Sequence, residues 1–198
     1  MRIPYVSNPP PTKTEEEAAI VKRVEERRAP RPLQSLDLAL LHSPSVADGW
    51  NSFLGAVRTK TSLSDDLREL AICRVAVCNK AWYEWKHHAP LAAKGGVSED
   101  GLEAIKQDTL GDQPAALSKK QWAVILYTDE MTRNVHVKDA TFDHLREFFN
   151  EQEIVEITAT SGKGTVPAPK LSLVIDEGLC PPNLPRTATK QEMDDAIA

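Results

Sequence analysis

Residues 64–96, which read SDDLRELAICRVAVCNKAWYEWKHHAPLAAKGG, decide the fold. A serine followed by two aspartates is typical of a helix start, because the hydroxyl accepts from free backbone N–H groups and the acids complement the helix dipole. Apolar side chains then cover almost every side of the segment up to Val77, which predicts a helix in the middle of the protein. A second helix is predicted from about Lys80 to Lys94, ending at Gly95-Gly96, since glycine best accepts the left-handed turn after a helix.

The same helical periodicity recurs through most of the chain. Apolar residues three and four positions apart, preceded by capping residues, predict further helices. These cover residues 14–28 and 36–41, then 44–57, a short one from 98, 118–131, 139–149 and 150–157. No stretch before residue 170 alternates convincingly with period two, so the predicted fold class is all-α.

Three segments are predicted along the chain: an arm with a short helix over 1–34, a helical domain over 35–160, and an irregular tail over 161–198. Prolines at positions 4, 9, 10 and 11 favour an extended N-terminal arm, because proline lacks an N–H and has a fixed φ. Two glycines and two prolines in residues 161–169 argue against a stable helix there. Residues 171–175 are compatible with a lone short strand.

The amino-acid composition limits the kinds of molecule that the protein is expected to bind. The 198 residues include 24 Lys+Arg and 29 Asp+Glu, a net charge of −5, and the longest basic run is Arg27-Arg28, so a nucleic-acid partner is not expected. The longest apolar stretch, Leu70–Cys78, is interrupted by Arg74 and is far shorter than the roughly 20 residues that cross a bilayer, so no membrane association is expected. The cysteines cannot all pair internally, which favours a reducing, cytoplasmic location; they are Cys73, Cys78 and Cys180.

Glu69, Glu84 and His88 are the candidate catalytic residues. Glu84 and His88 stand four positions apart, so they share a helix face, and Glu69 lies on the preceding apolar helix, where a carboxylate needs a partner. A carboxylate that accepts from an imidazole fixes its tautomer and prepares it for proton transfer. The alternative is an exposed Glu84–His88 pair, with Glu69 bound structurally by Arg68 or Arg74. No cluster has zinc-ligand spacing, so no metal site is predicted.

Several motifs resemble the carboxymuconolactone decarboxylase family of the alkylhydroperoxidase D-like fold. They are Arg68-Glu69-Leu70-Ala71-Ile72, Glu84-Trp85-x-x-His88 and Gly95-Gly96-Val97-Ser98. The similarity covers about residues 35–160 and implies a helical bundle, a homo-oligomer (trimer or hexamer) and a small-molecule substrate. The family normally closes with a long apolar helix, whereas this chain continues with Ser161-Gly162-Lys163-Gly164, so we expect that helix to be missing.

The resemblance also separates two reactions. The peroxidase branch of this superfamily has a Cys-x-x-Cys pair between the glutamate and the histidine, but Ala81 and Glu84 stand at those positions here. Thiol peroxidase activity is therefore the alternative, together with a non-catalytic helical oligomer. The decarboxylase branch implies His88 as proton donor or shuttle, oriented by Glu84 and Glu69. It further implies Arg74 as a partner of the substrate carboxylate and Trp82 and Trp85 as walls of the site, with no cofactor.

Overall fold

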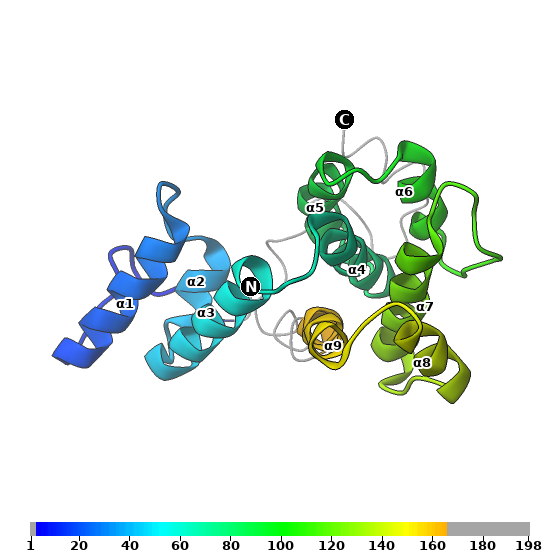
Figure 1. Cartoon of the computed structure of the whole chain (residues 1–198). Coiled ribbons are helices and arrows are strands. Elements are labelled where there is room, and N and C mark those ends of the chain that lie inside the picture. Colours follow the sequence, from blue (N-terminus) through cyan, green and yellow to red (C-terminus); the bar gives the residue numbers. More distant parts are fainter. Residues whose placement is uncertain (1–2, 166–198) are drawn as a thin grey trace. The chain divides into compact units, whose positions relative to one another are not determined.

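The computed structural model describes residues 3–165, with side chains up to residue 162 (Figure 1). Every regular element in this range is an α-helix, which confirms the all-α prediction. The described residues divide between Thr61 and Ser62 into two compact units. The possible strand at residues 171–175 lies outside the described residues.

The N-terminal unit contains three helices, α1 (Glu15–Arg28), α2 (Ser35–Leu40) and α3 (Pro44–Thr59). The predicted cap of α1 is present, since the backbone N–H of Glu17 donates to the Thr14 hydroxyl over 3.1 Å. The buried Arg28 guanidinium donates to both carboxylate oxygens of Asp37, over 2.7 and 2.8 Å, and ties α1 to α2. The arm before α1 contacts the same unit through a 2.6 Å hydrogen bond between His42 Nε2 and the Pro4 carbonyl.

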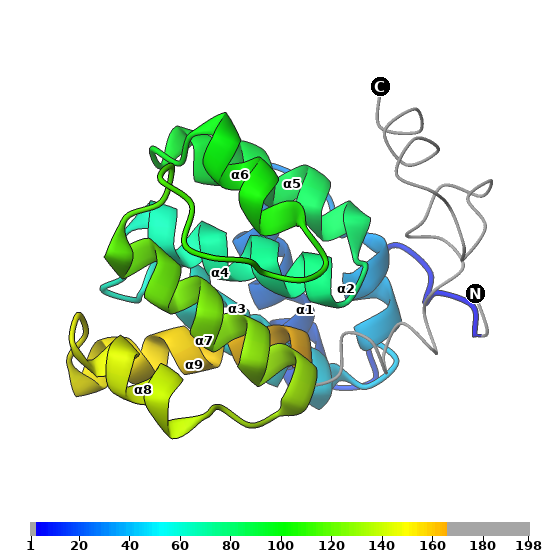
Figure 2. The ribbon, with the colours of Figure 1, turned by 90° about the vertical axis from the view of Figure 1, so that its right-hand side faces the viewer.

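The second unit is built around one central helix. It contains α4 (Asp65–Cys78), α5 (Trp82–Lys94), α6 (Glu99–Lys106), α7 (Lys119–Asn134), α8 (Asp139–Arg146) and α9 (Glu151–Thr165). Helix α4 packs against α5, α6, α7 and α9, as the two views in Figures 1 and 2 show. Every residue of α4 from Glu69 to Val77 is buried, which confirms the prediction of a central helix.

Two apolar clusters hold this unit together. One joins α4 to α5, α6 and α7 and includes Leu70, Trp85, Ile105 and Ile125. The other joins α4 to α7, α8 and α9 and includes Leu67, Ala71, Val124, Leu145 and Ile157. Because α4 contributes to both clusters, a polar side chain on it must find its partners inside the protein.

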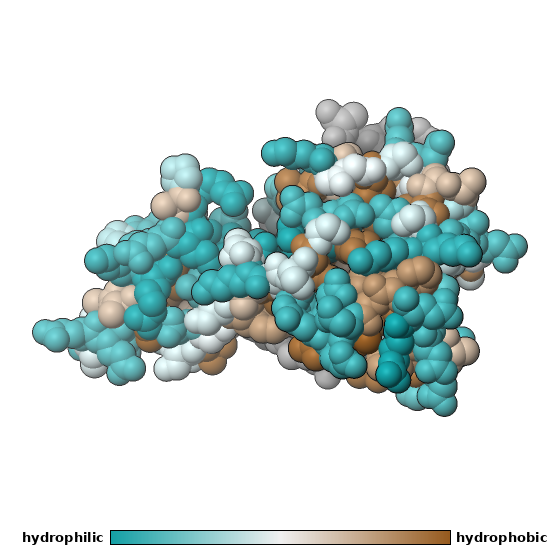
Figure 3. All heavy atoms as spheres, viewed as in Figure 1, coloured by the Kyte–Doolittle hydropathy of each residue, from teal (hydrophilic) through white to brown (hydrophobic). Residues whose placement is uncertain are grey.

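Polar residues dominate the face in Figure 3, with apolar patches between them.

Two turns hold α5 against α4. In the first, Lys80 has a left-handed φ of 54°, and the N–H of Ala81 donates to the Ala76 carbonyl over 2.8 Å, so the chain reverses within a few residues. After α5, Gly96 has a φ of 104°, a conformation in which glycine avoids Cβ strain. A Cβ atom at Gly95 would lie 2.8 Å from the backbone N of Asp66, so only glycine permits this close approach to the start of α4.

Helix α9 corrects one prediction. It continues to Thr165, whereas the sequence analysis expected no stable helix after Thr160. The Ser161 hydroxyl is fully buried and lies 3.0 Å from the Thr128 hydroxyl of α7. One turn earlier, the hydroxyls of Thr158 and Tyr127 lie 2.7 Å apart. These contacts with α7 offset the poor helix propensity of Gly162 and Gly164, so α9 extends further than local propensity predicts. The expected absence of a further closing helix concerns residues outside the described range.

Candidate active site

Glu69 and His88 form a buried pair across α4 and α5. Nδ1 of His88 lies 2.6 Å from Oε2 of Glu69, and each side chain is only 7% exposed. An ionised carboxylate has no proton to donate, so Nδ1 carries the hydrogen of this bond and Nε2 is left as the nitrogen that exchanges protons. The hydrogen bond therefore has a defined direction, from Nδ1 of His88 to the carboxylate of Glu69.

Glu84 approaches the opposite side of the same ring. Its Oε2 lies 3.4 Å from Nε2 of His88, one helical turn away on α5, and its side chain is 43% exposed. The structure thus brings together all three candidate catalytic residues. The alternative of an exposed Glu84–His88 pair does not fit, because the imidazole is buried between the two acids.

Arg68 is the second partner of Glu69. Its Nε donates to Oε1 of Glu69 over 3.4 Å, leaving Oε2 for the imidazole. Burial is the largest influence on the pKa of Glu69 and raises it, but the hydrogen bond and charge of His88, with the charge of Arg68, hold that pKa below its usual value. Glu69 is therefore an anion at neutral pH despite its burial.

Arg74 belongs to a different, structural network. Its Nε and Nη2 donate to Oδ1 of Asp129 over 2.8 and 2.5 Å. Its other donors reach three backbone carbonyls of the α6–α7 connection and the end of α6, at 2.8, 2.5 and 2.9 Å; these belong to Ile105, Gln107 and Asp108. All five N–H groups of this fully buried guanidinium are used. The predicted contact of Arg74 with a substrate carboxylate does not fit this arrangement, because no donor remains.

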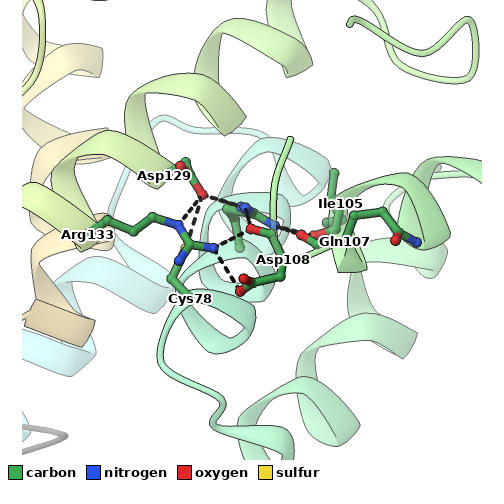
Figure 4. A network of polar contacts seen from close by, with 7 residues as sticks. Cys78, Ile105, Gln107, Asp108, Asp129 and Arg133 are labelled. Atoms are coloured by element: carbon green, nitrogen blue, oxygen red, sulfur yellow. Dashed lines mark hydrogen bonds and ion pairs between the residues drawn. The ribbon is translucent and has the colours of Figure 1, made fainter. Parts of the chain in front are cut away.

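Figure 4 shows the rest of this network. Arg133 lies one turn after Asp129 on α7 and donates to it over 3.0 Å, and it also binds the Asp108 carbonyl. The Cys78 thiol donates to the same Asp129 oxygen over 3.3 Å. Asp129 and Arg133 were not singled out from the sequence. Their four-residue spacing on a predicted helix was the available signal, but nothing local linked them to Arg74.

The two tryptophans occupy different environments. Trp85 is buried in the apolar cluster of α4 to α7, so it packs in the core. Trp82 is partly buried against the same cluster. A role for Trp82 beside a substrate stays a prediction.

The described cysteines are poor nucleophiles. Burial and the charge of Glu69 raise the pKa of the Cys73 thiol to about 12. Burial also raises the pKa of Cys78 to about 12, with Asp129 adding to the effect. Almost no thiolate is present at neutral pH, and thiolate is the form that attacks peroxides. Cys180 lies outside the described residues.

Two further observations concern residues 3–165. Their histidine, cysteine and acidic side chains form no group of three able to hold a metal ion. None of their helices is long and apolar enough to span a membrane.

One protein-family model matches the part of the chain that contains the candidate site. Residues 44–124 match the model of the carboxymuconolactone decarboxylase family, and the matched range contains Glu69, Glu84 and His88. Residues 44–124 are thus similar to the carboxymuconolactone decarboxylase family. The resemblance inferred from the motifs is confirmed, and the motifs around the candidate site lie inside the matched range.

Solved structures confirm the fold that this family implies. A protein of unknown function from Agrobacterium tumefaciens, described as an antioxidant defence protein AhpD, is 19% identical; the match covers 69% of this chain and 91% of that one, with a TM-score of 0.58. The debrominase Bmp8 in its apo form is 11% identical, with 92% and 90% covered and a TM-score of 0.64. Its cysteine-to-alanine variant in complex with 2,3,4-tribromopyrrole is 13% identical, with 93% and 92% covered and a TM-score of 0.63. No curated protein sequence matches the chain.

Proposed function

We propose that this protein is a cofactor-free acid/base lyase. Its substrate is a small carboxylated lactone or a similar compound, and the reaction is a decarboxylation or a related isomerisation. His88 donates or shuttles the proton, Glu69 orients the imidazole, and Glu84 connects it to solvent. The substrate class comes from the carboxymuconolactone decarboxylase family match, whereas the roles of the residues come from the geometry of the site.

The observation that carries this proposal is the position of the His88 ring between two carboxylates. Oε2 of Glu69 accepts a hydrogen bond from Nδ1 of His88 over 2.6 Å, so the ring cannot turn without losing a charge-assisted hydrogen bond. Nε2 faces Glu84, whose side chain reaches solvent. A buried imidazole with one fixed nitrogen and one nitrogen in reach of an exposed acid suits a group that takes protons from water and passes them to a substrate.

The proposed chemical step balances within this set of groups. The bond between the substrate carbon and its carboxylate breaks, carbon dioxide leaves, and the electron pair spreads into the conjugated lactone as an enolate. Nε2 of His88, after it has taken a proton from water by way of Glu84, gives that proton to carbon, which forms the new C–H bond and leaves the ring with its hydrogen on Nδ1. Water restores the proton by way of Glu84. The substrate is its own electron sink, so the step consumes only a proton.

Thiol peroxidase activity has no support in the described residues. Ala81 and Glu84 stand at the two positions where a redox pair would lie, and both described cysteines have strongly raised pKa values. The carboxylate of Glu84 has no sulfur for attack on a peroxide. The acid/base mechanism, in contrast, uses side chains that are present, those of Glu69, Glu84 and His88.

The test compares His88→Gln with His87→Gln. Both change a histidine of α5, but His87 is exposed and stacks edge-on against Tyr83 at 4.4 Å between ring centroids. With a panel of carboxylated unsaturated lactones, we expect carbon dioxide release by the wild type and by His87→Gln. His88→Gln should be slower by at least about 100-fold, the usual contribution of a general acid. Unchanged turnover in His88→Gln, with intact circular dichroism, removes His88 from the mechanism.

We also propose that the protein is a homo-oligomer, as the family resemblance implies. Large apolar side chains remain exposed on the second unit, among them Tyr83, Leu91 and Val155, which supports a further interface. Light scattering at micromolar concentration should give the mass of a trimer or hexamer. A monomer would contradict this proposal without affecting the chemistry of His88.

A further inference from the structure

Arg68 is a largely buried cation that contacts Glu69 and that the proposed reaction does not use. Its side chain is 13% exposed. Nε points to Oε1 of Glu69 at 3.4 Å, Nη1 to the Leu63 carbonyl at 3.4 Å, and Nη2 to Oδ1 of Asp65 at 2.5 Å. The guanidinium is thus anchored at the start of α4, and its Nε is aimed at the outer oxygen of Glu69.

We propose that Arg68 is a positioning residue of this site: it binds Oε1 of the Glu69 carboxylate, helps to keep that group ionised, and so keeps Oε2 directed at Nδ1 of His88. It does not touch the reacting atoms. Arg68 acts on Glu69, Glu69 holds the hydrogen of His88 on Nδ1, and Nε2 is thereby left without a hydrogen. The catalytic meaning of this inference rests on the proposed function, but the effect on Glu69 does not.

The need for such a residue follows from the burial of Glu69. A carboxylate removed from water tends to take up a proton, and here burial is the largest influence on its pKa. A protonated Glu69 would be able to donate a hydrogen to Nδ1 instead of accepting one. The imidazole would then change tautomer, with its hydrogen on Nε2, and the direction of the proton path would reverse. An adjacent guanidinium, which stays charged at any relevant pH, lowers the pH at which this protonation occurs.

The other charged groups around α4 leave this task to Arg68 and His88. Cys73 on α4 is a neutral thiol at neutral pH because its pKa is raised to about 12, and Glu84 of α5 is an acid that faces the other side of the ring. Four charged groups of the other helices that pack on α4 have partners elsewhere. Asp129 pairs with Arg74, Glu130 with Lys138, Lys120 with Glu153, and Glu156 with Ser62.

The experiment follows the Glu69 carboxyl carbon by ¹³C NMR as the pH is lowered, with the signal assigned by its absence in Glu69→Gln. In Arg68→Met we expect the midpoint of this titration to rise by about one pH unit, since an opposite charge in contact shifts a carboxyl pKa by roughly that amount or more. Arg68→Lys should recover part of the shift.

The control is Arg133→Met, which removes a half-buried arginine of the same unit that binds Asp129 and not Glu69. It should leave the Glu69 midpoint unchanged. A midpoint in Arg68→Met within a few tenths of a unit of wild type would overturn the proposal. If that variant loses its helical circular dichroism, Arg68→Gln decides, and an unchanged midpoint there has the same meaning.

This readout needs no substrate, so it separates the two proposals. At neutral pH, ¹⁵N NMR of the His88 ring, assigned with His88→Gln, should show the proton on Nδ1 in the wild type. If Arg68→Met shifts the Glu69 titration but His88→Gln turns over substrate normally, the proposed function fails and the role of Arg68 stands. If Arg68→Met leaves the Glu69 titration unchanged and His88→Gln loses turnover, the role of Arg68 is rejected and the proposed function stands.

Discussion

Glu69 and His88 lie 19 residues apart in the sequence, and their Oε2 and Nδ1 atoms meet at 2.6 Å in the interior of the second unit. Both side chains are almost fully buried, and each has a second partner, Arg68 for the carboxylate and Glu84 for the imidazole. The four groups form an unbroken chain from a guanidinium anchored on α4 to an acid that reaches solvent from α5. Buried networks of this kind stabilise a fold only when every member keeps its partner.

Glu69→Gln should destabilise the protein in a pH-dependent way. The pKa of Glu69 in the folded protein lies below its usual value of 4.5 because His88 and Arg68 outweigh burial. Its charge therefore stabilises the folded state fully above the pKa of the unfolded chain, and this contribution is lost as the pH falls through the lower folded-state pKa. We expect a loss of about 1–3 kcal/mol in the free energy of unfolding at neutral pH, measured with urea.

That difference should shrink as the pH falls below the unfolded-state value. The matched control is Glu84→Gln, which alters the exposed acid on the same imidazole and should cost under about 1 kcal/mol. A Glu69→Gln difference that stays constant on acidification would argue against an ionised Glu69 in the folded protein.

Arg74→Met should be the more damaging substitution. It leaves Asp129 and three carbonyl groups without their donor in a buried site, and removal of one partner of a buried ion pair typically costs about 3–5 kcal/mol. Chemical unfolding followed by circular dichroism measures the loss. Arg133→Met, whose side chain is 32% exposed, should cost about 1 kcal/mol. Equal effects of the two substitutions would show that Arg74 has no special structural role.

Cys73 and Cys78 should be almost inert in the folded protein. Their pKa values of about 12 leave the thiolate roughly a thousandfold scarcer than for an ordinary cysteine. Peptide-resolved alkylation at neutral pH should therefore be far slower for both sites in native protein than in denaturant. The measurement is made in Cys180→Ser, so that the remaining thiol does not contribute. Fast native labelling at Cys78 with consumption of hydroperoxide would restore the peroxidase alternative.

The end of α9 should depend on its hydroxyl contacts with α7. A double-mutant cycle of Thr128→Ala and Ser161→Ala should give a coupling energy of about 1 kcal/mol, because the two buried hydroxyls satisfy each other at 3.0 Å. The cycle Thr158→Ala with Thr128→Ala serves as the comparison, since Thr158 binds Tyr127 instead. Additive effects in the first cycle would mean that Ser161 is not seated on α7 as described.

Most helix boundaries were predictable, because their causes are local. Thr14, Ser98 and Ser118 each accept from a backbone N–H at the start of a helix, and such caps are visible as residue types in the sequence. Ser64 is the N-cap of α4 as predicted, but its hydroxyl makes no capping hydrogen bond. The end of α9 was predicted wrongly for the opposite reason. Local propensity disfavours a helix across Gly162 and Gly164, but contacts with a helix some thirty residues earlier outweigh it.

The candidate site was predictable in part. Spacing alone placed Glu84 and His88 on one helix face. The burial of α4 predicted that Glu69 needs a partner, and in the structure Glu69 has two, His88 and Arg68. Arg74 shows where this reasoning fails. An arginine on a fully apolar helix must point to some acceptor, but a substrate, an aspartate of α7 and free carbonyls after α6 are equivalent candidates until the helices are placed.

By itself, the sequence determined the all-helical class, the positions at which helices begin, and the absence of a cysteine pair beside His88, since periodicity, caps and residue types are properties of neighbouring residues. Only the tertiary structure decided that His88 faces Glu69 and that Arg74 faces Asp129. The physical reason is that backbone hydrogen bonds set the phase of each helix separately. The contact between two helices depends instead on the sum of many packing interactions and on turns such as the one at Lys80, where the chain reverses to bring α5 against α4.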